Sequence, residues 1–174
     1  MIKKFLPLIF GAALTGCAVF IYDSRTIVLA VLMLFLPLFD QRWQLSPSSI
    51  TQYRITLLSL GCVIIVLLIG LNPDYATAAL ITLLIAALPE EWFFRAYFMM
   101  RIEKKGLRPY QANILTSLFF ALLHLPVQGW FGLTVFVPSL FYGFIYQRSR
   151  DIVLIVLLHA ISNIVFFVYI QDYL

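Results

Sequence analysis

The sequence of 174 residues contains few charged side chains. Only 11% of its residues are Asp, Glu, Lys or Arg, whereas 63% are apolar. A soluble domain carries about 25% charged residues, so this composition excludes an ordinary soluble protein, and its apolar content excludes a disordered one. Since about 20 helical residues cross the hydrocarbon core of a bilayer, we expect membrane helices joined by short loops. The chain is therefore predicted to be all-α: a polytopic membrane helical bundle, forming a single integral membrane domain over residues 1–174.

Cysteine is also scarce, and motifs for common cofactors are absent. Cys17 and Cys62 both lie in apolar runs without a disulfide or metal-ligand spacing, so each is expected to be a small buried residue. Residues 14–17 follow the order of a lipoprotein cleavage site, but the apolar run continues beyond Cys17, which makes lipidation the less favoured alternative. There is no glycine-rich phosphate loop, CxxC pair or internal repeat. The net charge of +4 resides in loops, so no nucleic-acid partner is expected.

Uncharged runs predict about seven transmembrane helices. The run from Pro109 to Gln147 is too long for one span and is divided at Pro126, Gln128 and Gly129. The run that begins at Tyr75 is extended to Met100, because aromatic residues surround its charges. The predicted helices cover residues 5–22, 26–39, 55–73, 75–100, 109–126, 129–147 and 152–171. The first two form an N-terminal helical hairpin within residues 1–54, and the catalytic core is placed at about residues 75–170.

The basic residues predict the orientation. With the N-terminus in the cytoplasm, ten Lys and Arg residues fall in cytoplasmic segments and Arg25 alone falls in an outer loop. Basic residues in short loops stay on the cytoplasmic side, so we expect a multi-pass protein of the cell inner (cytoplasmic) membrane with its N-terminus cytoplasmic. The basic segment Arg101–Arg108 is interpreted as a cytoplasmic anchor, with binding of anionic lipid headgroups as the alternative.

Five ionisable residues fall inside predicted spans: Glu90, Glu91, Arg95, His124 and His159. Each such group costs about 2.5–3.5 kcal/mol on insertion scales, so each needs a partner or a function. Both histidines of the chain are in this set. Counted at about 1.5 Å per residue from the cytoplasmic helix ends, Glu90 and the two histidines all lie in the inner and middle part of the bilayer. The sequence therefore predicts one polar cluster within the membrane.

The spacing of these residues assigns them to helix faces. Glu91 and Arg95 are four residues apart, with the acid first, which favours an ion pair on one face. Glu90 is rotated by about 100° and is the freer carboxylate. Pro89 removes one backbone hydrogen bond, so the helix is expected to kink or restart there. His159 and Asn163 share one helix face, as do Phe120 and His124.

These groups are suited to hydrolysis of a peptide bond by one of two mechanisms. In the first, Glu90 takes a proton from water, one imidazole orients that water or protonates the leaving amine, and the other imidazole and Asn163 stabilise the oxyanion. In the second, Glu90, His124 and His159 hold a catalytic zinc ion with one open position. The residue pattern does not separate these mechanisms.

Three ordered motifs resemble those of a known family. The sequence reads EExxxR at 90–95, FxxxH at 120–124 and HxxxN at 159–163. This set resembles the CAAX protease and bacteriocin-processing family (CPBP, also called ABI), which includes the type II CAAX prenyl endopeptidases. Ala96 departs from the pattern, because the family often has Gly after the motif arginine. The resemblance implies an all-helical intramembrane endopeptidase of the glutamate type.

The resemblance also implies residue roles and partners. Glu90 and His124 would activate the water, His159 and Asn163 would form the oxyanion hole, and Glu91, Arg95 and Phe120 would shape the site. No cofactor is expected, with a divalent metal such as zinc as the alternative. The substrate would be a membrane-anchored protein or peptide, cleaved near the membrane, such as a C-terminal sorting signal or leader. Two other interpretations are a non-catalytic membrane interaction or immunity protein of the same fold, and a small transporter with a proton relay.

Overall fold

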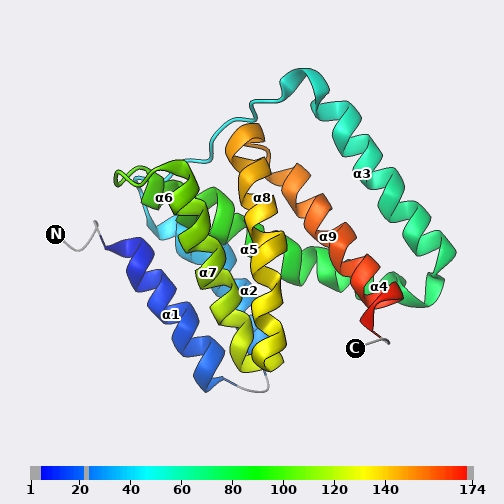
Figure 1. The fold of residues 1–174 in the computed structure, drawn as a ribbon, viewed down its shortest axis with the longest axis horizontal. Coiled ribbons are helices and arrows are strands. Elements are labelled where there is room, and N and C mark those ends of the chain that lie inside the picture. The colour runs from blue at the N-terminus through cyan, green and yellow to red at the C-terminus, as the bar shows by residue number, and fades with distance from the viewer. Residues whose placement is uncertain (1–4, 22–23, 172–174) are drawn as a thin grey trace.

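The computed structural model describes residues 5–21 and 24–171, and within these ranges the chain forms helices and no strand. The predicted all-α class is therefore confirmed. Figure 1 shows α1 (Leu6–Phe20) and α3 (Thr51–Leu71) at opposite sides of the bundle. Lys3, Lys4 and Asp23, on which part of the predicted orientation depends, lie outside the described residues.

The helices follow the uncharged runs because prolines and charged residues lie at their ends. Pro109 is the first residue of α7, and its missing N–H is not needed at that position. The third helix begins at Thr51, one turn earlier than predicted, and so includes Arg54. The other separate helices are α2 (Arg25–Phe35) with the short η2 (Leu36–Phe39), α7 (Pro109–Gln128), η6 (Gly129–Val135), α8 (Phe136–Ser149) and α9 (Ile152–Tyr169).

One long helix, Pro73–Glu103, runs through the middle of the bundle, and we call it the central helix. It is continuous past Pro89, so the expected restart at this residue does not occur, whereas the predicted extension through the charged residues is correct. Wider π turns precede and follow Pro89, and the N–H of Leu88 bonds to the carbonyl of Leu83 five residues earlier. These turns let the backbone pass the proline ring without ending the helix. Its segments are η3 (Pro73–Tyr75), α4 (Ala76–Ile81), η4 (Thr82–Ala87), α5 (Leu88–Glu91), η5 (Trp92–Met99) and α6 (Met100–Glu103).

Helices α7 and α8 form an antiparallel hairpin, as the division of the long uncharged run predicts. The chain turns at Gly129, which has a positive φ of 58° that favours glycine. The Asn113 side chain donates to the carbonyl of Leu140 at 2.9 Å, and Gln147 Nε2 donates to the carbonyl of Pro109 at 2.6 Å. The first bond joins α7 to the first half of α8, and the second joins the start of α7 to the end of α8. Figure 1 shows the two helices side by side.

Four segments are long and apolar enough to cross a membrane: Thr51–Leu71, Pro73–Glu103, Pro109–Ser149 and Ile152–Tyr169. The third of them contains both helices of the α7–α8 hairpin. Helix α1 has 15 residues and α2 has 11, so both are shorter than the usual span of about 20. The chain is thus a multi-pass membrane protein, while the count of seven spans and the cytoplasmic N-terminus stay predictions.

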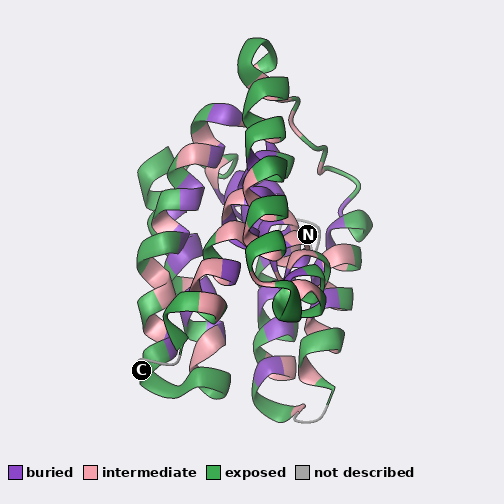
Figure 2. Cartoon of the chain, turned by 90° about the vertical axis from the view of Figure 1, so that its right-hand side faces the viewer, coloured by how far each residue is buried: buried purple, intermediate pink, exposed green. Residues whose placement is uncertain are grey.

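The core surrounds the central helix, and α3 lies outside it. Phe93, Phe94 and Tyr97 of the central helix are fully buried. Helix α3 packs on α9, where Gly61 faces Leu157, and leaves its other faces exposed, as Figure 2 shows. Cys62 lies on this exposed surface, so the prediction of a buried residue is wrong there, because α3 has one packed face only.

Ion pairs tie the helices together at the end of the bundle where α6 meets α8. Arg101 is buried and pairs with Asp40 at 2.8 Å, so it is not part of a lipid-facing surface and the basic segment is shorter than predicted. Asp151 accepts from Arg54 at 2.5 Å and from the backbone N–H of Leu154 at 3.1 Å, which caps α9. Burial alone would raise the pKa of the Asp151 carboxyl, but these two hydrogen bonds hold that pKa below its ordinary value.

Candidate active site

Glu90 and Glu91 occupy different environments on α5. The side chain of Glu90 is 18% exposed and faces a cavity, whereas that of Glu91 is fully buried behind it. Adjacent helical residues are rotated by about 100°, which separates the two carboxylates. The expectation that Glu90 is the freer carboxylate agrees with this geometry.

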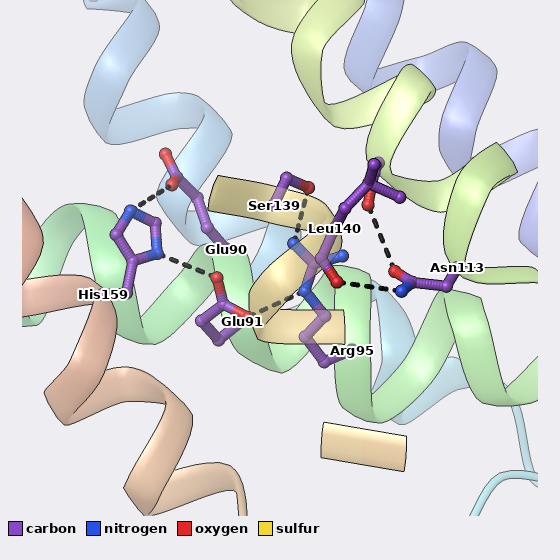
Figure 3. A network of polar contacts seen from close by, with 8 residues as sticks. Glu90, Glu91, Arg95, Asn113, Ser139, Leu140 and His159 are labelled. Atoms are coloured by element: carbon purple, nitrogen blue, oxygen red, sulfur yellow. Dashed lines mark hydrogen bonds and ion pairs between the residues drawn. The ribbon is translucent and has the colours of Figure 1, made fainter. Parts of the chain in front are cut away.

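Glu91 is the shared acceptor of a buried network, which Figure 3 shows. Its Oε2 accepts from Arg95 Nε at 2.9 Å, and this is the ion pair that the four-residue spacing predicts. Its Oε1 accepts from Nδ1 of His159 at 2.8 Å, a contact that the sequence analysis did not predict. Arg95 in turn donates from Nη2 to the hydroxyl of Ser139 at 2.7 Å. The three helices α5, α8 and α9 are thereby joined through one carboxylate and one guanidinium.

The imidazole of His159 lies between the two glutamates. Because a carboxylate only accepts, the short bond to Glu91 places a proton on Nδ1. The other ring nitrogen, Nε2, lies 3.7 Å from Oε2 of Glu90. The ring also stacks on Tyr142, with centroids 5.2 Å apart and planes at 22°. The orientation of His159 is therefore fixed by a hydrogen bond and by an aromatic neighbour.

His124 is fixed by its own helix. Its Nδ1 donates to the backbone carbonyl of Phe120, four residues earlier, at 2.9 Å, and the two rings lie 4.5 Å apart. A carbonyl only accepts, so Nδ1 carries the proton and Nε2 is the ring nitrogen left for chemistry. No ion pair joins His124 to Glu90 within the described part of the chain; both residues instead line the same cavity.

This cavity has a volume of about 480 Å³ and is bordered by α2, the central helix, α7, η6, α8 and α9. Most of its lining is apolar or aromatic. The predicted site residues in its wall are Glu90, Phe120, His124, His159 and Asn163, whereas Glu91 and Arg95 support them from behind. Asn163 lines the cavity, and its amide forms no hydrogen bond to another described residue. The sequence-predicted residues thus come from three helices to one apolar cavity, with two of them in a supporting position.

Among the polar residues of the wall that sequence reasoning missed, two on α8 contact the predicted site residues directly. Ser139 and Tyr142 line the cavity from α8, where Ser139 contacts Arg95 and Tyr142 stacks on His159. They stand three residues apart in the segment FVPSLFY, and an uncharged run gives no reason to single them out.

The zinc alternative requires Glu90, His124 and His159 to converge on one point. Among the described residues, no group of three or more His, Cys, Asp or Glu side chains is placed to hold a metal ion. Nδ1 of each histidine is hydrogen-bonded inside the protein, so Nε2 is the ring nitrogen that a metal ion would have to reach. The described residues therefore do not converge on a metal site in this arrangement.

Residues 72–165 match the family described as type II CAAX prenyl endopeptidase Rce1-like. The match covers more than half of the chain and includes all seven candidate site residues. The chain belongs to this family. Its members are CAAX-type intramembrane proteases, which implies a membrane-embedded protein that acts on a substrate. Searches of curated proteins and of solved structures gave no significant match.

Proposed function

We propose that this chain is an intramembrane endopeptidase in which Glu90 activates a water molecule. The observation that supports this most directly is the pairing of Glu90 with His159 in the wall of the apolar cavity, 3.7 Å apart, with His159 held from behind by Glu91. A carboxylate in such an apolar cavity needs a catalytic role or a charged or hydrogen-bonding partner. A histidine fixed by a buried carboxylate is a common arrangement in hydrolytic sites.

The reaction proceeds by addition of water to the peptide carbonyl. Glu90 takes one proton from the water while its oxygen bonds to the carbonyl carbon, and Nε2 of His124 orients the water across the cavity. The carbonyl oxygen becomes an oxyanion that Asn163 and His159 stabilise, as the family resemblance implies. When the carbon–nitrogen bond breaks, the amine nitrogen receives the proton that Glu90 took. The products are then a carboxylic acid and an amine, and Glu90 is again ionised. The second proton of the water passes from the acid to the amine, which leaves a carboxylate and an ammonium group.

The cavity favours a substrate with an apolar segment. Its walls carry residues such as Leu29, Met33, Phe94 and Phe131 beside the polar cluster. Such a lining favours a peptide that itself carries an apolar segment, as a membrane-anchored chain does. We propose that the substrate is a membrane-associated protein or peptide, cleaved at a C-terminal sorting signal or a leader.

The test uses the purified full-length protein in liposomes with two probes: a farnesylated peptide that ends in a CAAX sequence, and a peptide that carries a short motif, an apolar helix and a basic tail. Glu90→Gln, His124→Ala and His159→Ala should each lower the cleavage rate by about 10²–10⁴, the usual contribution of a general acid or base. Glu103→Gln is the matched control, because this acid lies on the central helix outside the cavity wall.

A Glu90→Gln variant with full activity would exclude Glu90 as the base. Wild-type protein that cleaves neither probe, yet binds the apolar peptide equally well with and without Glu90, would favour the non-catalytic interaction protein. Activity that disappears on chelation and returns with stoichiometric zinc would restore the metal mechanism.

A further inference from the structure

The hydroxyl of Ser139 has a proton that no described residue accepts. Arg95 is a donor only and is never deprotonated in proteins, so Ser139 Oγ must be the acceptor in their 2.7 Å hydrogen bond. A hydroxyl that accepts one bond still has its own proton to donate. Within the described ranges, no carbonyl, carboxylate or other acceptor is bonded to this proton. The hydroxyl therefore has one fixed partner and one open donor position.

The charge of Arg95 strengthens this donor. The guanidinium is fully buried, and its Nη1 has no hydrogen-bond partner among the described residues. Hydrogen bonds from an ionised donor are about twice as strong as neutral ones, and chains of such bonds polarise one another. Arg95 thus draws electron density from the Ser139 oxygen and makes its proton a better hydrogen-bond donor.

The position of Ser139 allows it to meet the substrate. Ser139 is fully buried and borders the same cavity as Glu90, His159 and Asn163. Figure 3 shows the contacts that run from Glu90 through His159, Glu91 and Arg95 to Ser139. The two ends of this chain of contacts are a base and a donor, both at the cavity. His159, one of the two oxyanion donors implied by the family resemblance, has both ring nitrogens next to carboxylates, at 2.8 and 3.7 Å. The two carboxylates compete with the oxyanion for the His159 ring, so a further donor besides Asn163 and His159 would strengthen the oxyanion hole.

We propose that the Ser139 hydroxyl donates a hydrogen bond to the carbonyl oxygen of the scissile peptide and stabilises the oxyanion. This inference rests on the proposed protease function and adds a catalytic residue to it. It also gives Arg95 a role beyond its ion pair with Glu91, because Arg95 orients and polarises the donor.

The experiment compares Ser139→Ala and Ser139→Thr with Ser117→Ala in the cleavage assay. Ser117 is the matched control: it is equally buried, lies on the neighbouring α7, donates to Asn113 and is not in the cavity wall. Ser139→Ala should lower kcat by about 10²–10³, with KM changed by no more than about threefold, as for loss of an oxyanion donor. Ser139→Thr should recover most of the rate, and Ser117→Ala should match the wild type.

Inhibitor binding separates a catalytic role from a structural one. A peptide aldehyde, which forms a tetrahedral hydrate, should bind Ser139→Ala more weakly by the same factor as kcat falls, whereas the matching peptide alcohol should bind it as it binds the wild type. Equal weakening of both compounds, or unchanged kcat, would overturn the role of Ser139. If the Ser139 predictions fail while Glu90→Gln is inactive in the same assay, only the inference about Ser139 is refuted. If Glu90→Gln is active, the proposed protease mechanism itself is refuted.

Discussion

Replacement of Glu91 by Gln should strongly destabilise the protein, although the two side chains have almost the same shape. The carboxylate of Glu91 accepts from Arg95 Nε at 2.9 Å and from His159 Nδ1 at 2.8 Å, and Glu91 and Arg95 are fully buried. A Gln amide has one acceptor oxygen and one donor group, so it satisfies one of these donors and opposes the other. Removing one partner of a buried ion pair costs about 3–5 kcal/mol, and we expect Glu91→Gln to lose a free energy of unfolding in this range.

The measurement is unfolding of the purified protein by titration of SDS into mixed micelles, followed by circular dichroism. Asp74→Asn is the control, since Asp74 is exposed at the start of the central helix and should change the unfolding free energy by less than about 0.5 kcal/mol. In the double variant Glu91→Gln, Arg95→Met no buried guanidinium is left unpaired, so its loss should be smaller than the sum of the two single losses. A Glu91→Gln variant within about 1 kcal/mol of the wild type, or strictly additive losses, would refute the shared-acceptor reasoning.

Two further predictions concern the residues around the site. A methyl group on Gly132 would lie 2.8 Å from the carbonyl carbon and oxygen of His124, so Gly132→Ala must shift η6 or the backbone of this histidine. Either shift disturbs the cavity wall, so this variant should lower the cleavage rate at least about tenfold. Gly70→Ala, with open space at its Cβ, should not. The pKa of Asp151 is below its ordinary value, so its stabilising effect is complete above about pH 4 and is lost as the pH falls through its folded-state pKa. The thermal midpoint of Asp151→Asn should therefore lie below that of the wild type at pH 7, and the difference should shrink toward pH 3; a difference that does not depend on pH would contradict this.

Local spacing and the pattern of charges predicted the features that depend on near neighbours. The Glu91–Arg95 ion pair follows from a separation of four residues on one helix, and the turn at Gly129 follows from a proline and a glycine inside a run too long for one span. Similarly, aromatic residues around Arg95 indicated that the helix continues beyond it. Each of these inferences needs only the geometry of a single helix or turn.

Contacts between distant segments could not be predicted in the same way. His159 and Glu91 are 68 positions apart, and their bond depends on how α9 is rotated about its axis against α5. A run of apolar residues that is buried on several sides does not specify this rotation. Ser139 illustrates the same limit, because a single serine in an uncharged run has no partner at helical spacing. Its contact with Arg95 arises from the packing of α8 on the central helix.

The N-terminal part of the chain carries none of the three family motifs, yet it supports the helix that carries the site. Asp40, which sequence analysis places in a loop, is buried, pairs with Arg101 and accepts from the hydroxyl of Tyr97 at 3.3 Å. Nearby, the indole N–H of Trp43 donates to the carbonyl of Ala96 at 2.7 Å. Ala96 directly follows Arg95, so this bond fixes the backbone beside the guanidinium that holds both Glu91 and Ser139. Support for the site thus comes from residues before the stretch 72–165 that matches the family, where no pattern of charge or spacing could reveal it.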